Sequence, residues 1–349
     1  MSVSAAVSVA LGVPGVTFAK LAAVSTRQSS PPVVAVVGAT ASGKTALALA
    51  LAERLGGEIV NTDSMQVYRG MDIGTAKLPA HERRGITHHL LDLLEVTEPA
   101  TVAQFQRWAR AVIEDCHDRG VTPVLVGGSA LYTRAIIDRF EFPGTDPAVR
   151  ARLEAELADV GPEVLHARLA RTDAAAAQQV EPRNGRRVVR ALEVIELTGR
   201  PFSASLPGKR YHYDGAVQVG VDIDRASLDR RIEQRVAQMW AAGFVEEVRD
   251  LEGRGLREGR TANRALGYRQ LLAFLDGDIS ESAAQEQTCA GTRRFARRQD
   301  SWFRKDPRIT WVAYDDPERV ERAVEAVRLI DSGEASEDPA GGGAGERRP

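Results

Sequence analysis

Five short, mostly apolar runs divide the chain, and each has the length of a buried strand. Residues 33–37 are apolar and β-branched, which is typical of a parallel strand covered on both faces. The other four predicted strands are residues 58–63, 121–126, 217–223 and 309–314. Stretches with helical composition or spacing separate them, at residues 46–55, 105–119, 131–137, 227–242 and 292–305. The alternation predicts an α/β fold with a parallel sheet flanked by helices.

Strand signals are missing from residues 141–210, where prolines punctuate helical stretches at 148–158 and 162–169. We interpret 141–210 as a helical insertion. The α/β core would then comprise residues 33–140 and 211–330. We expect residues 1–32 to be a weakly ordered extension, for which a misassigned start codon is an alternative explanation. Residues 331–349 are Gly, Ser, Pro, Ala and charged residues, typical of a disordered tail.

Two helical stretches carry many arginines. In the insertion, Arg183, Arg186, Arg187 and Arg190 fall on one helical face, and the apolar Val188 belongs to the opposite face. Such a face is usually only solvated, but four arginines with no carboxylate among them would suit a phosphate backbone. In residues 292–305 the spacing predicts Phe295 and Trp302 inward, with the basic residues mainly outward. These basic residues are Arg293, Arg294, Arg297, Arg298, Arg304 and Lys305.

A glycine-rich loop follows the first strand and fits the pattern G-x-x-x-x-G-K-[ST]. Its residues are Gly38, Ala39, Thr40, Ala41, Ser42, Gly43, Lys44 and Thr45. In this setting backbone N–H groups and the following helix N-terminus bind phosphate oxygens. Lys44 would contact the outer phosphates and the Thr45 hydroxyl would be a ligand of Mg²⁺. The sequence therefore predicts a P-loop, but not the reaction at the phosphates.

The ends of the next two strands carry the remaining candidate chemistry. Asp63 ends the second strand, and ligands bind beyond the carboxyl ends of strands in open α/β sheets, so we expect it to face the phosphate site. The third strand ends in Gly127, Gly128 and Ser129, where a P-loop ATPase would have a carboxylate for Mg²⁺. The pair His88 and His89 could bind a metal ion, but we favour an ordinary structural role because no second set of ligands is nearby.

Composition restricts the possible partners. The formal net charge is −2, so nucleic acid could be attracted only by local basic patches. Two distant cysteines argue against a disulfide framework or zinc finger and fit a reducing cytoplasm. No apolar run approaches the roughly 18 residues of a membrane-spanning helix. We expect a cytoplasmic protein and, as the simpler alternative, a monomer.

Several stretches together resemble the tRNA dimethylallyltransferases, also called tRNA isopentenyltransferases, of the bacterial type. The most specific stretch is residues 63–77, DSMQVYRGMDIGTAK. The others are the P-loop, VGGS ending at Ser129, RALEV beginning at Arg190, and LGYRQ containing Arg269. Two departures are small: Ser129 replaces the usual Thr, and Ala39 replaces a common Pro. The resemblance covers about residues 33–314.

The resemblance implies transfer of a dimethylallyl group from dimethylallyl diphosphate to the N6 amine of the adenine at tRNA position 37, with Mg²⁺ as cofactor. It implies a catalytic set of Asp63, Thr45, Ser129 and Arg269, with Asp63 as the base. Arg264 and Arg269 would be additional diphosphate ligands. The implied tRNA-binding residues are Asp63, Ser64, Met65, Gln66, Ser129, Arg150, Arg186, Arg187, Val188, Val189 and Arg190.

Three alternatives stay open on the residues alone. The first is a P-loop small-molecule kinase whose lid is the insertion, although it leaves the Gly127–Gly128 strand end unexplained. The second is an isopentenyltransferase acting on free AMP or ATP, which has less use for a basic insertion. The third is a non-catalytic RNA-binding module, which would have no use for Lys44, Thr45 and Asp63 together.

Overall fold

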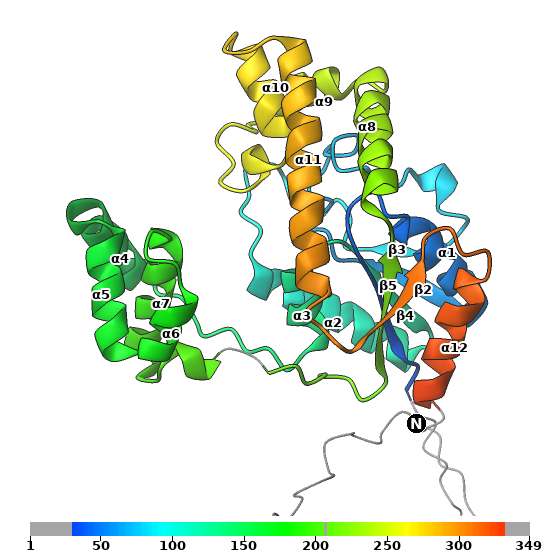
Figure 1. Cartoon of the computed structure of the whole chain (residues 1–349), viewed down its shortest axis with the longest axis horizontal. Helices are drawn as coiled ribbons and strands as arrows, with labels where there is room; N and C mark the ends of the chain where they lie inside the picture. The colour runs from blue at the N-terminus through cyan, green and yellow to red at the C-terminus, as the bar shows by residue number, and fades with distance from the viewer. Residues whose placement is uncertain (1–29, 206–207, 332–349) are drawn as a thin grey trace, which may run out of the picture. The chain divides into compact units, whose positions relative to one another are not determined.

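A parallel sheet of six strands forms the centre of the computed structural model, which describes residues 30–205 and 208–331 (Figure 1). Its strand order is β3-β2-β4-β1-β5-β6. The strands are β1 Val33–Val37, β2 Gly57–Asn61, β3 His88–His89, β4 Thr122–Val126, β5 Ala216–Asp222 and β6 Ile309–Ala313. The predicted α/β class and five of these strands are confirmed. The short edge strand β3 was not predicted, because two histidines carry no strand pattern.

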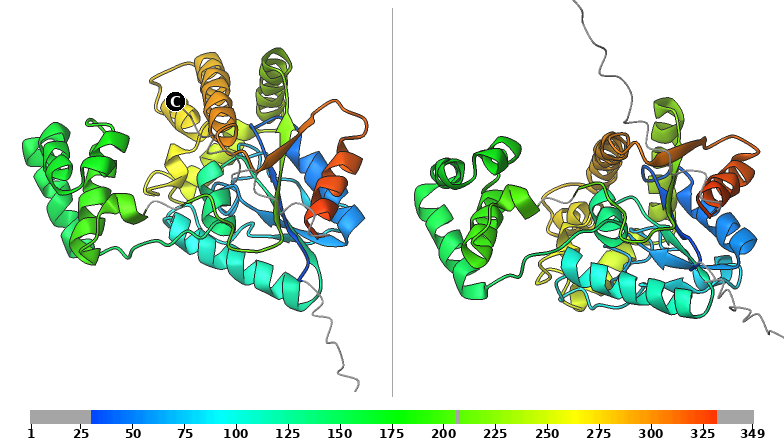
Figure 2. Two further views of the ribbon diagram at one scale, coloured as in Figure 1. Left: turned by 60° about the horizontal axis from the view of Figure 1, so that its bottom comes forward. Right: turned by 90° about the horizontal axis from the view of Figure 1, so that it is seen from below.

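Helices cover both faces of the sheet, as the two views in Figure 2 show. Alternate residues of β1 point to opposite faces: Val34 and Val36 share a hydrophobic cluster with α1 (Lys44–Leu55) and α12 (Arg319–Asp331). Val33, Ala35 and Val37 join the cluster of the other face. That face is covered by α2 (Val102–Asp118) and α3 (Ala130–Ile137), with α9 (Phe244–Gly253) and α10 (Tyr268–Leu275) in the same cluster.

Two long helices stand beside the carboxyl ends of the strands. They are α8 (Arg225–Ala241) and α11 (Glu281–Phe303), and each begins at a residue whose side chain accepts a hydrogen bond from the first turn. Asp224 accepts from Ser227 N at 2.9 Å, and Ser280 accepts from Ala283 N at 3.2 Å. Short 3-10 turns complete the described part of the core at η1 (Ala80–Glu82) and η3 (Ala262–Arg264).

The regular elements in the described part of the predicted insertion are all helices. Its helices are α4 (Pro147–Val160), α5 (Pro162–Thr172), α6 (Ala174–Gln179) and α7 (Gly185–Thr198), followed by η2 (Phe202–Ser205). They share a hydrophobic cluster of their own, in which Val188 and Leu192 are buried as predicted. The cluster contains no residue of the sheet. The domain boundaries at 141 and 210 stay predictions. The predicted tail lies largely outside the described residues, and so do residues 1–29 of the predicted extension.

One predicted orientation is wrong. Phe295 and Trp302 of α11 are 40% and 54% exposed, whereas Ala296, Gln299 and Phe303 are buried. The helix begins eleven residues before the predicted start, at Glu281 rather than residue 292. The prediction used only residues 292–305, in which the two aromatic residues share one helical face. That face does not contact the core.

Candidate active site

The P-loop is the centre of the site. Gly38 has a φ of 139° and Gly43 a φ of 103°, and a Cβ at Gly38 would lie only 3.1 Å from the carbonyl oxygen of Val221. Glycine is therefore required where the loop turns against β5. Gly43 is the N-cap of α1 and offers no side-chain hydrogen bond to the helix. The first N–H groups of α1 are consequently available to a phosphate, with the positive end of the helix dipole behind them.

Lys44 shares a cavity of about 110 Å³ with Asp63, so the phosphate loop and the end of β2 face one space. The Lys44 ammonium donates a hydrogen bond to the carbonyl oxygen of Ala39 at 2.6 Å. Burial and the neighbouring Arg235 lower the pKa of Lys44 to about 7, although Asp63 opposes the shift. The protein alone offers too little negative charge to keep this buried ammonium protonated. A bound anion in the cavity would favour its charged form.

Asp63 lies two residues beyond the end of β2, in the turn that opens the loop of residues 63–77. Its Oδ1 accepts a hydrogen bond from Met65 N at 2.9 Å, and its own N–H donates to Asn61 Oδ1 at 2.8 Å. Burial raises the pKa of Asp63, despite the opposing effects of the Met65 N–H and Lys44. A carboxylate with a raised pKa is a stronger base, which suits proton removal near neutral pH.

Sequence reasoning missed two arginines of α8 that face the P-loop. Arg231 donates to the carbonyl oxygen of Ala41 at 2.8 Å, and Arg235 approaches the Thr40 hydroxyl at 3.5 Å. Both line a cavity of about 580 Å³ beside Lys44 and Thr45. Within the described residues Arg235 has no carboxylate partner, so its guanidinium is free to bind an anion. These residues lie about 190 positions after the loop, and no local pattern links them to it.

Gln299 of α11 ties the P-loop to the end of β4. Its Oε1 accepts from Thr40 N and its Nε2 donates to the carbonyl oxygen of Gly128, each at 2.8 Å. A Cβ at Gly128 would lie 2.3 Å from Gln299 Nε2, and one at Gly127 would lie 2.1 Å from Thr62 Oγ1. Both glycines are therefore explained by close packing. Ser129 follows them as the N-cap of α3, and its side chain makes no capping hydrogen bond.

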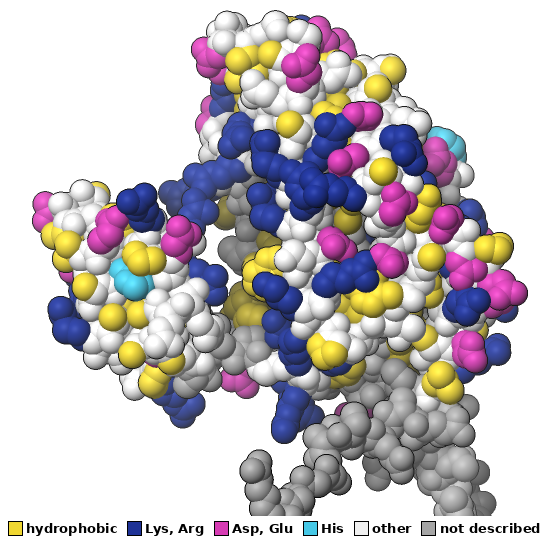
Figure 3. Space-filling model, viewed as in Figure 1, with side chains coloured by type: hydrophobic (Ala, Val, Ile, Leu, Met, Phe, Trp, Pro, Cys, Tyr) yellow, Lys and Arg dark blue, Asp and Glu magenta, His cyan; other side chains and the backbone are white. Residues whose placement is uncertain are grey.

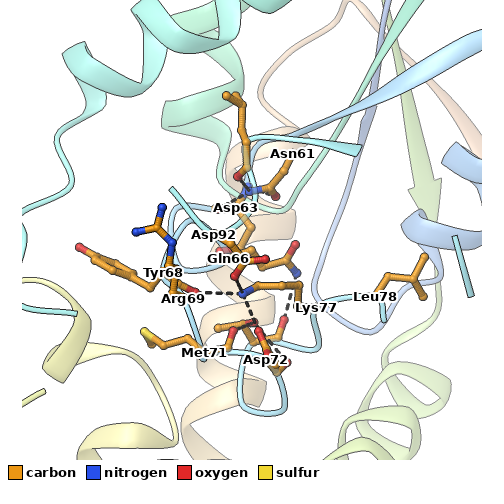
Figure 4. A network of polar contacts seen from close by, with 12 residues as sticks. Asn61, Asp63, Gln66, Tyr68, Arg69, Met71, Asp72, Lys77, Leu78 and Asp92 are labelled. Carbon is orange, nitrogen blue, oxygen red and sulfur yellow. Dashed lines mark hydrogen bonds and ion pairs between the residues drawn. The ribbon is translucent and has the colours of Figure 1, made fainter. Parts of the chain in front are cut away.

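Two groups hold the loop of residues 63–77 in place, and Figure 4 shows the first of them, the contacts of Lys77. From inside, the buried Lys77 ammonium binds Asp72 and Asp92 at 2.6 Å each and donates to the Tyr68 carbonyl oxygen at 2.9 Å. From outside, the carboxylate of Glu247 on α9 accepts hydrogen bonds from three consecutive backbone N–H groups. These belong to Asp72, Ile73 and Gly74, at 3.1, 2.6 and 3.2 Å.

Gln66 connects this loop support to the cavity. Its side chain lines the same cavity as Asp63 and donates to the Thr75 carbonyl oxygen at 3.1 Å. Ser64 and Met65 lie between Asp63 and Gln66 and are half-buried. Asp63 and Gln66 therefore face the cavity beside the P-loop, whereas Ser64 and Met65 do not line it.

The structure does not bring Arg264 and Arg269 to the P-loop. Both side chains are exposed, one on η3 and one on α10, and neither lines the two cavities described above. Their role as diphosphate ligands stays a prediction, and Arg231 and Arg235 line the cavity beside the P-loop. The spacing of Arg264 and Arg269 around Gly267 shows that they are close in the chain, but it could not show whether they face the P-loop.

The arginine face of α7 is less uniform than its spacing indicated, and Arg183 is not on it, because the helix begins only at Gly185. Arg186 and Arg187 are exposed, but Arg190 donates to the buried Glu193 at 2.7 Å. Arg150 of α4 also hydrogen-bonds with Glu193. The sequence has no carboxylate between these arginines, but Glu193, three residues after Arg190, neutralises part of this face.

Val188 and Val189 are both buried in the insertion core. A tRNA contact at these two positions would have to come from backbone atoms.

Of the histidine pair, His89 joins an ion-pair network, whereas His88 contacts the Ile86 carbonyl oxygen. His89 contacts Glu58 at 2.7 Å, near Cys116, so three potential metal ligands gather there. However, Arg119 donates to both oxygens of Glu58, at 2.8 and 2.7 Å, and its hydrogen bonds lower the pKa of Glu58 to about 2. A guanidinium in that position repels a cation, which supports the ordinary structural role of His89.

The fold and site define a P-loop α/β protein with a phosphate cradle opposite a carboxylate and without a carboxylate at the end of β4. The IPP transferase family matches residues 66–306, so the chain belongs to that family. It is 68% identical to a tRNA dimethylallyltransferase of Nocardioides sp., over 85% of this chain and 96% of the relative. It is 62% identical to a tRNA dimethylallyltransferase of Salinispora arenicola, over 85% and 86% of the two chains. The predicted resemblance is confirmed.

Solved structures agree with this assignment. A tRNA isopentenylpyrophosphate transferase from Bacillus halodurans matches with a TM-score of 0.65 and 38% identity, covering 87% of this chain and 99% of the other. A eukaryotic dimethylallyltransferase acting on tRNA matches with a TM-score of 0.76 and 25% identity, covering 87% and 80%. No described helix is long and apolar enough to cross a membrane. Cytoplasmic location and a monomeric state stay predictions.

Proposed function

We propose that the protein transfers the dimethylallyl group of dimethylallyl diphosphate to the exocyclic N6 amine of the adenine at tRNA position 37. The observation that supports this most directly is one cavity shared by Lys44 of the P-loop and Asp63. It offers an anion site and a base to one reaction centre. The relatives named above support tRNA as the acceptor.

In the reaction the allylic C–O bond breaks and the diphosphate leaves with the bonding electrons. The N–H groups at the start of α1, Lys44, Arg231 and Arg235 stabilise the negative charge that gathers on the leaving diphosphate. The adenine amine attacks the allylic carbon, and Asp63 accepts the proton that the amine loses. The amine needs this help because its lone pair is delocalised into the ring.

Mg²⁺ fits the donor atoms at the start of α1. The exposed hydroxyl of Thr45 and the phosphate oxygens of the donor are hard oxygen ligands, which this ion prefers. When bound, Mg²⁺ would supply additional positive charge to the diphosphate. Thr45 would hold it, and the protein would need no further carboxylate ligand because the diphosphate itself supplies oxygens.

The tRNA interface would comprise two basic surfaces. One is Arg186 and Arg187 on α7, and the other is the exposed face of α11, where Lys and Arg side chains gather in Figure 3. The second surface is lined by Arg294, Arg297, Arg298, Ser301 and Trp302. Its exposed aromatic rings and arginines are of the kind that stack on unpaired bases and bind loop phosphates. The target adenine must leave its stack to reach Asp63.

The kinase alternative is disfavoured by the end of β4. A side chain at Gly127 would collide with Thr62, so the strand cannot carry the carboxylate that ATP-dependent phosphoryl transfer uses there. An assay with dimethylallyl diphosphate, ATP, AMP and unmodified tRNA separates the alternatives by which pair reacts. We expect prenylated tRNA only; phosphorylation of a metabolite or prenylation of AMP alone would refute the proposal.

Asp63→Asn tests the base within this function. Losing a general base should lower kcat by roughly 10²–10⁴-fold, while the Kd for tRNA stays near the wild-type value. Asp92→Asn is the matched control, because it removes a carboxylate from the Lys77 network of the same loop without changing the cavity lining. Near-normal turnover of Asp63→Asn, or an equal loss in both variants, would contradict the role of Asp63.

A further inference from the structure

Two chain segments connect the core with the helical insertion, and they are bonded to each other where they leave the core. Asp138 and Tyr211 form an isolated antiparallel bridge. Arg139 N donates to the Arg210 carbonyl oxygen at 2.9 Å, and His212 N donates to the Ile137 carbonyl oxygen at 2.7 Å. The outgoing and returning segments therefore form one two-stranded crossing at the base of the insertion.

One guanidinium holds both segments of this crossing. Arg308, between α11 and β6, donates to the two carboxylate oxygens of Asp138 at 2.7 and 3.2 Å. The same guanidinium lies over the ring of Tyr211, 4.2 Å from its centroid. Asp306 completes its surroundings at 2.6 Å. The planar, bidentate and stacking geometry is specific to arginine, since a lysine ammonium cannot reproduce it.

The contacts around Arg308 are buried and mutually satisfied. Asp138 is fully buried and also accepts from Arg134 at 3.0 Å. Gln218 of β5 donates to the Tyr211 hydroxyl at 3.1 Å, which fixes the ring to the sheet. Such a network in a poorly solvated position permits one arrangement and makes others costly.

We infer that Arg308 is a positioning residue for tRNA binding: it clamps the base of the insertion to the sheet and so restricts where Arg186 and Arg187 can be presented. The inference rests on the proposed function, in which the insertion binds tRNA. Without the clamp, binding must also order the insertion, and this cost appears in tRNA affinity. The donor binds in the P-loop half and should be unaffected.

Arg304 provides a matched control. It also stacks on an aromatic ring, 3.9 Å from the centroid of Trp311, and it pairs with Asp222 and Asp300. Its contacts lie within α11, β5 and β6 and touch neither segment of the crossing. The variants Arg308→Gln and Arg304→Gln each remove one ring contact and two carboxylate partners. The carboxylates of Arg304 are exposed and those of Arg308 are buried, but only Arg308 contacts the crossing.

For Arg308→Gln we expect the Kd for tRNA to rise on the order of tenfold, with kcat at saturating tRNA and the Kd for dimethylallyl diphosphate changed less than about twofold. Amide hydrogen exchange at Arg139 and His212 should accelerate, since these N–H groups bridge the two segments. Arg304→Gln should leave tRNA affinity and both exchange rates unchanged. If Arg308→Gln does not fold, Arg308→Lys is measured instead, with a smaller shift in the same direction.

The outcomes separate the two proposals. Unchanged tRNA affinity and exchange in the Arg308 variant, alongside weakened binding by Arg186→Ala/Arg187→Ala, would overturn the clamp and leave the function intact. Equal effects of the Arg304 and Arg308 variants would also overturn the clamp, because the loss would then be general. Failure of the wild type to prenylate tRNA would overturn the function, and the exchange rates would still show whether Arg308 holds the crossing.

Discussion

Replacing single arginines of α7 should separate folding from binding. Arg190 donates to Glu193 at 2.7 Å, to the Pro143 carbonyl oxygen at 2.6 Å and to the Gly144 carbonyl oxygen at 3.2 Å. Glu193 is fully buried. Arg190→Ala would thus remove one of the two guanidinium partners of a buried charge. Arg186 and Arg187 are exposed neighbours on the same helix.

Arg190 pairs with a buried carboxylate and its two neighbours are exposed, so their replacement should lower the free energy of unfolding by different amounts. Removing the partner of a buried ion pair costs about 3–5 kcal/mol when nothing compensates the remaining charge. Arg150 still hydrogen-bonds with Glu193, so we expect about 2–3 kcal/mol for Arg190→Ala. Exposed substitutions usually stay within about 0.5 kcal/mol, which is our expectation for Arg186→Ala and for Arg187→Ala. The spacing alone had indicated that all of these arginines face solvent.

The pH dependence has a definite sign. Burial opposes ionisation of Glu193, but hydrogen bonds from Arg150 and Arg190 outweigh it and hold the pKa of Glu193 below its usual value. A lowered pKa in the folded state stabilises the fold above the unfolded pKa, and this stabilisation is lost as the pH falls through the folded pKa. The difference between wild type and Arg190→Ala should therefore be largest near pH 7 and shrink below about pH 4.

The assay is urea unfolding at several pH values, with Arg190→Ala/Glu193→Gln as a further variant. Neutralising the carboxylate should recover part of the stability lost in Arg190→Ala. In parallel, tRNA titrations at several salt concentrations should show that Arg186→Ala/Arg187→Ala lowers the salt slope by about 1.4, from roughly 0.7 per loop phosphate contact. Equal stability of Arg190→Ala and the exposed variants would refute the buried-pair argument, and an unchanged slope would refute the phosphate contacts.

Two further results are expected at the P-loop half. Burial and Arg235 lower the pKa of Lys44 to about 7, so the free enzyme loses this positive charge as the pH rises. Calorimetry should therefore show that dimethylallyl diphosphate binds more weakly at pH 9 than at pH 7. In Lys44→Arg the affinity should depend less on pH. Glu247→Gln should lower kcat by about tenfold with little change in tRNA affinity, because loosening the loop misplaces Asp63 and Gln66. Tyr268→Phe, which removes one hydrogen bond to Glu247, should lower kcat less, and the reverse order would contradict this role.

The sequence predicted local features well because they depend on neighbouring residues. The apolar runs located five strands, and the P-loop pattern located the phosphate site. It could not predict contacts between distant elements: Arg231, Arg235 and Gln299 reach the P-loop only through the packing of α8 and α11. Helical spacing grouped the residues of one face, but it could not show whether that face meets the core, so the orientation of Phe295 and Trp302 was predicted wrongly.

The two glycines at the end of β4 show why this P-loop suits a leaving diphosphate. Gly127 lies against Thr62, and Gly128 leaves space for the Gln299 amide that binds Thr40. A carboxylate on either residue would displace Thr62 or Gln299, and displacing Gln299 would release the P-loop from α11. The close packing that fixes the cradle thus excludes the group that a phosphoryl-transfer enzyme needs there. Departure of an intact diphosphate requires only its charge to be stabilised, which Lys44 and the arginines of α8 can do.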